Sequence, residues 1–144
     1  MKLLIYITLL LPFYSFSQDI YDKGIINFQN EGLPCNLDSL DGEPVFEITE
    51  EPASYEGGSG KFYKAVVKTL QYVPELKHNL NNKIYITFII DKDGNVRNLC
   101  TNIGITAKSI NDFLALTANK WTPAKEKGNN VHQKMVLSMH IRFG

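Results

Sequence analysis

The clearest pattern in this chain is an alternation of side chains near its C-terminal end. One face of this segment is almost entirely apolar and consists of Val131, Gln133, Met135, Leu137, Met139, Ile141 and Phe143. Because successive side chains of a strand point to opposite faces, this spacing predicts one long strand with that face toward the core. The opposite face then carries His132, Lys134, Val136, Ser138, His140 and Arg142.

A second alternating segment lies earlier in the chain. Its core face is expected to hold Ile84, Ile86, Phe88 and Ile90. Asp93 and Gly94 come after it, in an Asp-x-Asp-Gly sequence that is also typical of calcium loops. Such a loop needs oxygen ligands over about 12 residues and ends in a Glu, whereas apolar residues follow here. We therefore predict a tight hairpin in which Asp93 and Gly94 supply the positive φ angles.

Three segments have the features of helices. Residues 61–70 show the helical spacing i, i+3, i+4, i+7 and i+8 in Phe62, Ala65, Val66, Thr69 and Leu70. Pro74 suits the first turn of a short second helix over residues 75–80. A third helix is expected over residues 109–120, with its apolar side ending in Trp121 and Pro123 preventing its continuation. Trp121 is expected in the core; an exposed aromatic anchor is the alternative.

The order of four short motifs resembles the C-terminal domain of TonB, the periplasmic energy transducer, in its Bacteroidetes-type form. The matching segments are Tyr55-Glu56-Gly57-Gly58, residues 88–96 with Asp93 and Gly94, Trp121-Thr122-Pro123-Ala124-Lys125, and Ile141-Arg142-Phe143. Val73, between Tyr72 and Pro74, and Glu56, where a Pro is usual, depart from the pattern. The resemblance gives structural roles to Gly57, Gly58, Asp93, Gly94, Trp121 and Pro123.

The resemblance also implies a topology. The fold would be α+β, a two-layer sandwich of a three- or four-stranded antiparallel sheet with helices packed on one face. The final strand would pair with residues 84–90 and lie at the edge of the sheet. Edge strands expose unpaired N–H and C=O groups, to which a partner peptide can add as a further strand. The predicted partner-binding residues on this strand are Lys134, Val136, Ser138, His140 and Arg142.

The first residues have the pattern of a secretory signal peptide. Lys2 precedes an apolar run from Leu3 to Phe16, and Ser15 and Ser17 fit the −3 and −1 positions of a cleavage site. The run contains Pro12 and is shorter than the ~20 residues of a membrane span. We therefore predict a signal peptide over residues 1–17, an N-terminal extension with one or two short strands over 18–50, and the TonB-like domain over 51–144. The protein is expected in the periplasm; an inner-membrane anchor facing the periplasm is the alternative.

Charge and cysteine content narrow the function further. The chain has 15 basic and 15 acidic residues without a basic cluster, so nucleic-acid binding has no electrostatic basis. Cys35 and Cys100 are the only cysteines. In an exported protein they permit one disulfide; two unpaired thiols are the alternative.

The sequence argues against an enzyme; a thiol activity that depends on Cys35 is the alternative. His132 and His140 are eight residues apart on one strand, about 26 Å, and cannot share a metal ion. The nucleophile, phosphate-loop and zinc-protease motifs are absent. We therefore predict no catalytic residue, no metal and no cofactor.

The predicted function is protein binding. By resemblance, the partners are periplasm-facing segments of outer-membrane TonB-dependent transporters. The sequence shows neither a convincing anchor nor a long Pro-rich spacer, which favours a free periplasmic adaptor. The alternatives are a short membrane-tethered TonB transducer for transmembrane transport and a structural envelope protein that self-associates, for example as a homodimer.

Overall fold

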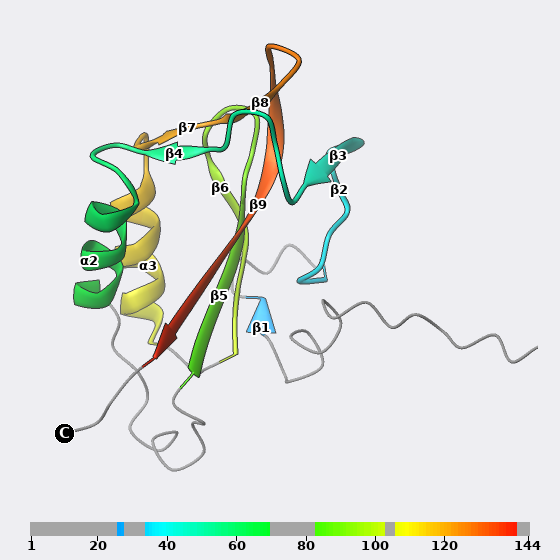
Figure 1. The fold of residues 1–144 in the computed structure, drawn as a ribbon. Helices are drawn as coiled ribbons and strands as arrows, with labels where there is room; N and C mark the ends of the chain where they lie inside the picture. Colours follow the sequence, from blue (N-terminus) through cyan, green and yellow to red (C-terminus); the bar gives the residue numbers. More distant parts are fainter. Residues whose placement is uncertain (1–25, 28–33, 70–82, 103–105, 141–144) are drawn as a thin grey trace, which may run out of the picture.

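The computed structural model describes residues 26–27, 34–69, 83–102 and 106–140. In this part of the chain the fold is α+β, with a curled mixed sheet and two helices (Figure 1). The α+β class is as predicted. The sheet has seven strands, in the order β1-β6-β5-β9-β3-β2 with β8 paired to β9, which is more than the three or four that the sequence predicted.

Three antiparallel strands form the centre of the sheet. They are β5 (Lys83–Ile90), β6 (Val96–Thr101) and β9 (Asn129–His140). β9 pairs with β5 along the whole of β5, from Lys83 opposite His140 to Ile90 opposite Gln133. The short β8 (Ala124–Glu126) pairs with the beginning of β9, and β1 (Ile26–Asn27) pairs with β6. The predicted pairing of the final strand with residues 84–90 is therefore confirmed.

Both described helices cover one face of this sheet. They are α2 (Ser59–Thr69) and α3 (Ala107–Thr117), which begins after the N-cap Thr106. The apolar residues that alternate along β5 and β9 pack against them, as predicted, in a core that includes Phe62, Val66, Ile84, Ile86, Phe88, Ile90, Phe113 and Met139. The third predicted helix is shifted toward the N-terminus, because α3 begins at Ala107 and ends at Thr117, so that Trp121 lies beyond its end. The helix predicted over residues 75–80 lies outside the described residues.

A segment that we call the strap, residues 34–46, joins the sheet beyond β9 and is bonded through Cys35 to the face of the sheet away from the helices. The strap contains the hairpin of β2 (Ser39–Leu40) and β3 (Glu43–Phe46), and Figure 1 shows it on the side away from the helices. A disulfide joins Cys35 to Cys100 of β6, and the Asn98 side chain donates to the Pro34 carbonyl at 2.9 Å. Ile89 and Leu40 are buried although neither belongs to the helix-side core.

The strap corrects two expectations. A sheet covered by helices on one face only would leave Thr87 and Ile89 exposed, but both are 2% exposed. The two-layer sandwich is therefore not confirmed, because the sheet is curled and mixed and part of the predicted N-terminal extension belongs to it. The described residues of that extension form three short strands, β1, β2 and β3, rather than one or two.

The hairpin between β5 and β6 is held by Asp91. Its carboxylate accepts hydrogen bonds from the main-chain N–H groups of Asp93 and Asn95, at 3.0 and 2.8 Å. Of the two residues expected to have positive φ, only Gly94 does, at +85°. The loop is longer than a two-residue turn. The bond from Asp91 N to Asn95 O closes the loop, and within it Gly94 N donates to Asp91 O and closes a smaller turn. Asp93 therefore needs no left-handed backbone.

A second, two-stranded sheet closes the top of the core. It pairs β4 (Ser54–Tyr55) with β7 (Trp121–Thr122). Trp121 is partly buried and packs against the core, and its ring lies 5.0 to 5.9 Å from those of Tyr55, Phe62 and Phe88. The predicted core role of Trp121 is confirmed, although it is reached from a strand and not from a helix. Gly57 and Gly58, both with positive φ, make the turn from β4 into α2.

Candidate functional site: the outer edge of the last strand

The side of β9 that faces away from β5 is the candidate binding edge. The hydrogen bonds of β5 fix which residues point there. Tyr85 O accepts from Asn102 N, and Asp91 N donates to Asn95 O, so the odd-numbered residues of β5 direct their main-chain polar groups toward β6. Main-chain groups alternate along a strand, and therefore the even-numbered residues of β5 bond to β9.

The register then assigns the residues of β9. Ile84, Ile86, Phe88 and Ile90 lie opposite Met139, Leu137, Met135 and Gln133. In an antiparallel ladder, residues that face each other bond to each other or point away together. The odd-numbered residues of β9 are thus bonded to β5. The main-chain groups of the even-numbered residues, His132 to His140, point outward.

Part of this outward side is already paired. β3 runs parallel to β9, with Val45 opposite His132 and Phe46 opposite Gln133. The prediction that the final strand is the edge of the sheet is therefore wrong for the first part of β9, because β3 and β2 lie beyond it. Within the described residues no strand pairs with the outer side of β9 from Met135 to His140. We call this stretch the open edge.

The predicted partner-binding residues are placed as follows. Val136, Ser138 and His140 belong to the open edge, and their side chains are exposed, Val136 to 52%. Lys134 lies beside it, half-buried, and burial lowers the pKa of its ammonium group. Arg142 lies outside the described residues. Three of the five residues are therefore brought together on one exposed face of the open edge.

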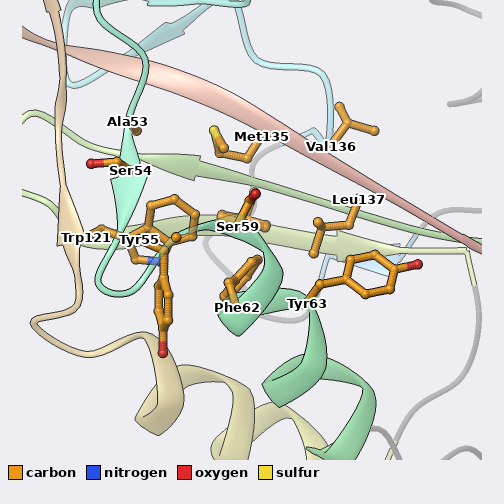
Figure 2. Close-up of a pocket in the computed structure, with 12 residues that line it drawn as sticks. Ala53, Ser54, Tyr55, Ser59, Phe62, Tyr63, Trp121, Met135, Val136 and Leu137 are labelled. Atoms are coloured by element: carbon orange, nitrogen blue, oxygen red, sulfur yellow. The ribbon is translucent and has the colours of Figure 1, made fainter.

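An apolar pocket of about 350 Å³ adjoins the open edge (Figure 2). It is lined by β9 at Met135, Val136 and Leu137, and otherwise by Ala53, Ser54, Tyr55, Gly58, Ser59, Phe62, Tyr63, Phe88 and Trp121. Three consecutive residues of a strand have side chains on both faces, so a pocket that contacts all three borders the strand's edge. The pocket thus lies between the open edge, β4 and the beginning of α2.

Aromatic rings and the absence of charge characterise this pocket. The rings of Tyr55, Phe62, Phe88 and Trp121 line it and pack against one another, with edge-to-face contacts between Tyr55 and Trp121, between Phe62 and Phe88, and between Phe62 and Trp121. None of its lining residues is charged, and its polar side-chain groups are hydroxyls, such as those of Ser54 and Ser59, and the indole N–H of Trp121. It suits an apolar side chain better than a charged one.

Sequence reasoning missed the helix side of this site. Tyr63 of α2 lines the pocket and is 40% exposed. Val67 follows one turn later on α2 and is 54% exposed, but it does not line the pocket. Neither residue shares the helix face of the buried residues Phe62 and Val66. Two large apolar or aromatic residues on an exposed helix face were the signal in the sequence that could have indicated a binding surface. What the sequence lacked was the position of α2 relative to the last strand.

The wall of the pocket is tied to β9 by one glutamine. The side-chain oxygen of Gln133 accepts from Ala53 N at 2.7 Å, and its amide nitrogen donates to the Glu47 carbonyl at 3.4 Å. Because Gln133 is buried, these bonds satisfy an amide that would otherwise be costly. They explain why a polar residue interrupts the apolar face of the last strand, and they fix the chain between β3 and β4.

Cys35 and Cys100 form a disulfide, so the structure has the first of the two alternatives left by the sequence.

His132 is 2% exposed, its Nδ1 accepts from Lys92 N at 3.0 Å, and its Nε2 lies 3.4 Å from a Glu43 carboxylate oxygen. The sequence placed His132 on the strand face opposite the helices, with nothing expected to cover it. In the structure Glu43 and Val45 of the strap lie beside it. Among the described residues no three His, Cys, Asp or Glu side chains gather as metal ligands.

The described part of the chain contains no helix with the length and apolarity needed to span a membrane. Comparison with known proteins found no matching family model, no matching curated protein and no matching solved structure. The resemblance to the TonB C-terminal domain therefore stays a prediction based on the motifs.

Proposed function

We propose that this protein is a periplasmic protein-binding module that captures an extended peptide by strand addition along the open edge of β9. The observation that carries the proposal is the conjunction of two features. Within the described residues no strand pairs with the outward main-chain groups of Val136, Ser138 and His140, and this stretch of β9 borders an uncharged apolar pocket at Met135, Val136 and Leu137. Main-chain bonds would supply affinity, and the pocket would select a side chain.

The partner is proposed from the motif resemblance. It is a periplasm-facing segment of an outer-membrane transporter, and the protein acts as an adaptor for such transporters. An apolar or aromatic residue of that segment, opposite Met135 or Leu137, would enter the pocket, because residues that face each other across a ladder share a face. A membrane-tethered transducer is the alternative and differs in the N-terminal segment, not in this site.

The test uses synthetic nine-residue peptides tiled along the periplasm-facing N-terminal segments of the transporters encoded in the same genome. Binding is measured by fluorescence anisotropy and mapped by amide hydrogen exchange. We expect bound peptide to slow exchange at Val136, Ser138 and His140. Leu137 and Met139 should change little, because their amides already bond to β5.

N-methylation of the peptide provides a matched control. Methyl groups on alternate residues block the N–H groups on one side of an extended chain and leave the other side intact. One methylated series should lose binding and the other should keep it. Equal binding by both series would exclude strand addition. Self-association at the same edge would instead appear as a molecular mass that rises with concentration in sedimentation equilibrium.

A further inference from the structure

The strap and the open edge occupy the same side of β9, one after the other. β3 pairs at His132 and Gln133, and the open edge begins two residues later. The main-chain groups of His132 point outward, toward β3. The strap therefore covers an outward-facing residue that a longer added strand would otherwise reach.

The noncovalent hold on the strap is modest for its length. Besides the bond from Asn98 to the Pro34 carbonyl and the Glu43 carboxylate beside His132, β3 meets β9 at two ladder positions. The ion pairs Lys92–Glu43 and Arg97–Asp41 involve carboxylates exposed to 47% and 61%. Exposed pairs of this kind contribute little. Leu40 is the deeply buried apolar side chain of the strap. The free energy gained by burying it opposes the conformational entropy lost when residues 34–46 are ordered.

The covalent hold is the disulfide from Cys35 to Cys100, which lies in β6 at the centre of the sheet. We propose that this disulfide is a redox latch: it keeps the strap over the first part of the outer side of β9, and its reduction by a dithiol releases β3 and lengthens the open edge to include His132. This inference rests on the proposed function for its consequence, since the lengthened edge would bind a longer partner strand.

The chemistry requires one dithiol reductant. Cys35 is partly exposed whereas Cys100 is fully buried, so the reductant's thiolate attacks the sulfur of Cys35. The disulfide bond breaks, and Cys100 leaves as a thiolate that takes up a proton. The second thiol of the reductant then displaces Cys35 from the mixed disulfide. Two electrons pass to the protein, and the reductant ends as its own disulfide.

Release is distinct from unfolding, because the pocket wall has anchors of its own. Glu51 and Lys125 exchange main-chain hydrogen bonds at 2.8 and 3.1 Å, and Ser54 and Tyr55 pair with β7. Gln133 holds Ala53 from the other side. Reduction should therefore free residues 34–46 while the wall at residues 51–55 stays in place.

Amide hydrogen exchange of the oxidised and the reduced full chain tests the latch. Reduction should speed exchange at His132 at least tenfold more than at Leu137, whose N–H bonds to β5. The Cys35→Ala variant, which keeps the buried Cys100, should show the fast His132 exchange without reductant and no further change with it. Unchanged His132 exchange overturns the latch. Equal acceleration at His132 and Leu137, with loss of the circular dichroism signal, also overturns it, because the disulfide would then hold the whole domain.

Peptide binding separates this inference from the proposed function. Among tiled transporter peptides that bind the oxidised protein, nine-residue versions should gain about tenfold in affinity on reduction, the effect of one or two added main-chain hydrogen bonds. Six-residue versions, which match the open edge alone, should not change. An equal response of both lengths counts against the latch. If no tiled peptide binds in either state, the proposed function fails, while the exchange experiment still decides whether the strap is released.

Discussion

Gly94 lies directly against the main-chain carbonyl of Trp121: a methyl group at Gly94 would be 2.6 Å from that oxygen. The hairpin turn and the Trp-x-Pro segment, far apart in sequence, thus touch at a point with no room for a side chain. Pro123 lies in the same contact. This contact gives a physical reason for two of the motifs to occur together in one chain.

We expect Gly94→Ala to destabilise the protein by about 1–3 kcal/mol, because the new side chain needs a left-handed backbone and meets the Trp121 oxygen. Gly128→Ala is the matched control. Its φ is also positive, at +78°, but nothing lies within 4 Å of a methyl group there. Urea titration should find the larger loss at Gly94. Equal losses would mean that the contact with Trp121 has no energetic role.

Local patterns predicted the helix-side core well. The alternation in β5 and β9 and the helical spacing of Phe62 and Val66 specify which residues face inward, and these residues form the core. Trp121 was placed in a helix because the apolar positions of α3 continue past its end. The helix stops at Thr117, where the chain passes through Asn119 in a left-handed conformation. The spacing of apolar residues does not reveal where a helix ends when the apolar pattern continues beyond it.

Trp121→Ala should lower the free energy of unfolding by about 3 kcal/mol, the lower end of the range for large aromatic truncations, because the ring is only partly buried. Trp121→Phe should cost less, since it keeps an aromatic ring against Tyr55 and Phe62. Chemical denaturation monitored by circular dichroism measures both. A change near zero in the alanine variant would show that the contacts with the core contribute nothing, and would move Trp121 to the binding surface.

Cys35→Ala should lower the stability of the oxidised protein by about 4 kcal/mol, because the disulfide closes a loop with a sequence separation of 65. The reduced wild-type protein should melt close to the variant. Thermal denaturation with and without reductant measures this, and the reductant should leave the melting of Cys35→Ala unchanged. Identical melting of the oxidised and reduced wild type would show that the bond constrains neither state.

The strap, and its pairing with the first part of β9, could not be predicted from the sequence. Gly24, Gly32, Pro34 and Gly42 interrupt the N-terminal region, so its short strands have no periodicity to read. The two-residue pairing of β3 with β9 and the bond from Cys35 to Cys100 both join residues distant in sequence, and local patterns do not predict such contacts. The alternation of the last strand did predict which side chains share a face. Which of its main-chain groups point outward became evident only from the hydrogen bonds of Tyr85 and Asp91.

The assignment of the even-numbered residues of β9 as outward-pointing leads to the most specific prediction, which compares proline substitutions at two neighbouring positions. Val136→Pro removes an N–H that points to the open edge, and an edge position tolerates proline. Leu137→Pro removes an N–H bonded to β5 opposite Ile86. We expect the first variant to fold and to lose binding of the tiled transporter peptides, and the second to unfold or lose most of its stability.

Ser138→Ala serves as the control for this pair, because it alters an outward side chain but leaves every main-chain donor in place. It should weaken peptide binding only slightly, since strand addition depends on the main chain. Circular dichroism reports folding and fluorescence anisotropy reports binding for all three variants. A folded Val136→Pro protein that binds peptide with wild-type affinity would eliminate strand addition at this edge. A Val136→Pro protein as unstable as Leu137→Pro would show that Val136 points inward, and the assignment of the outward residues would be wrong.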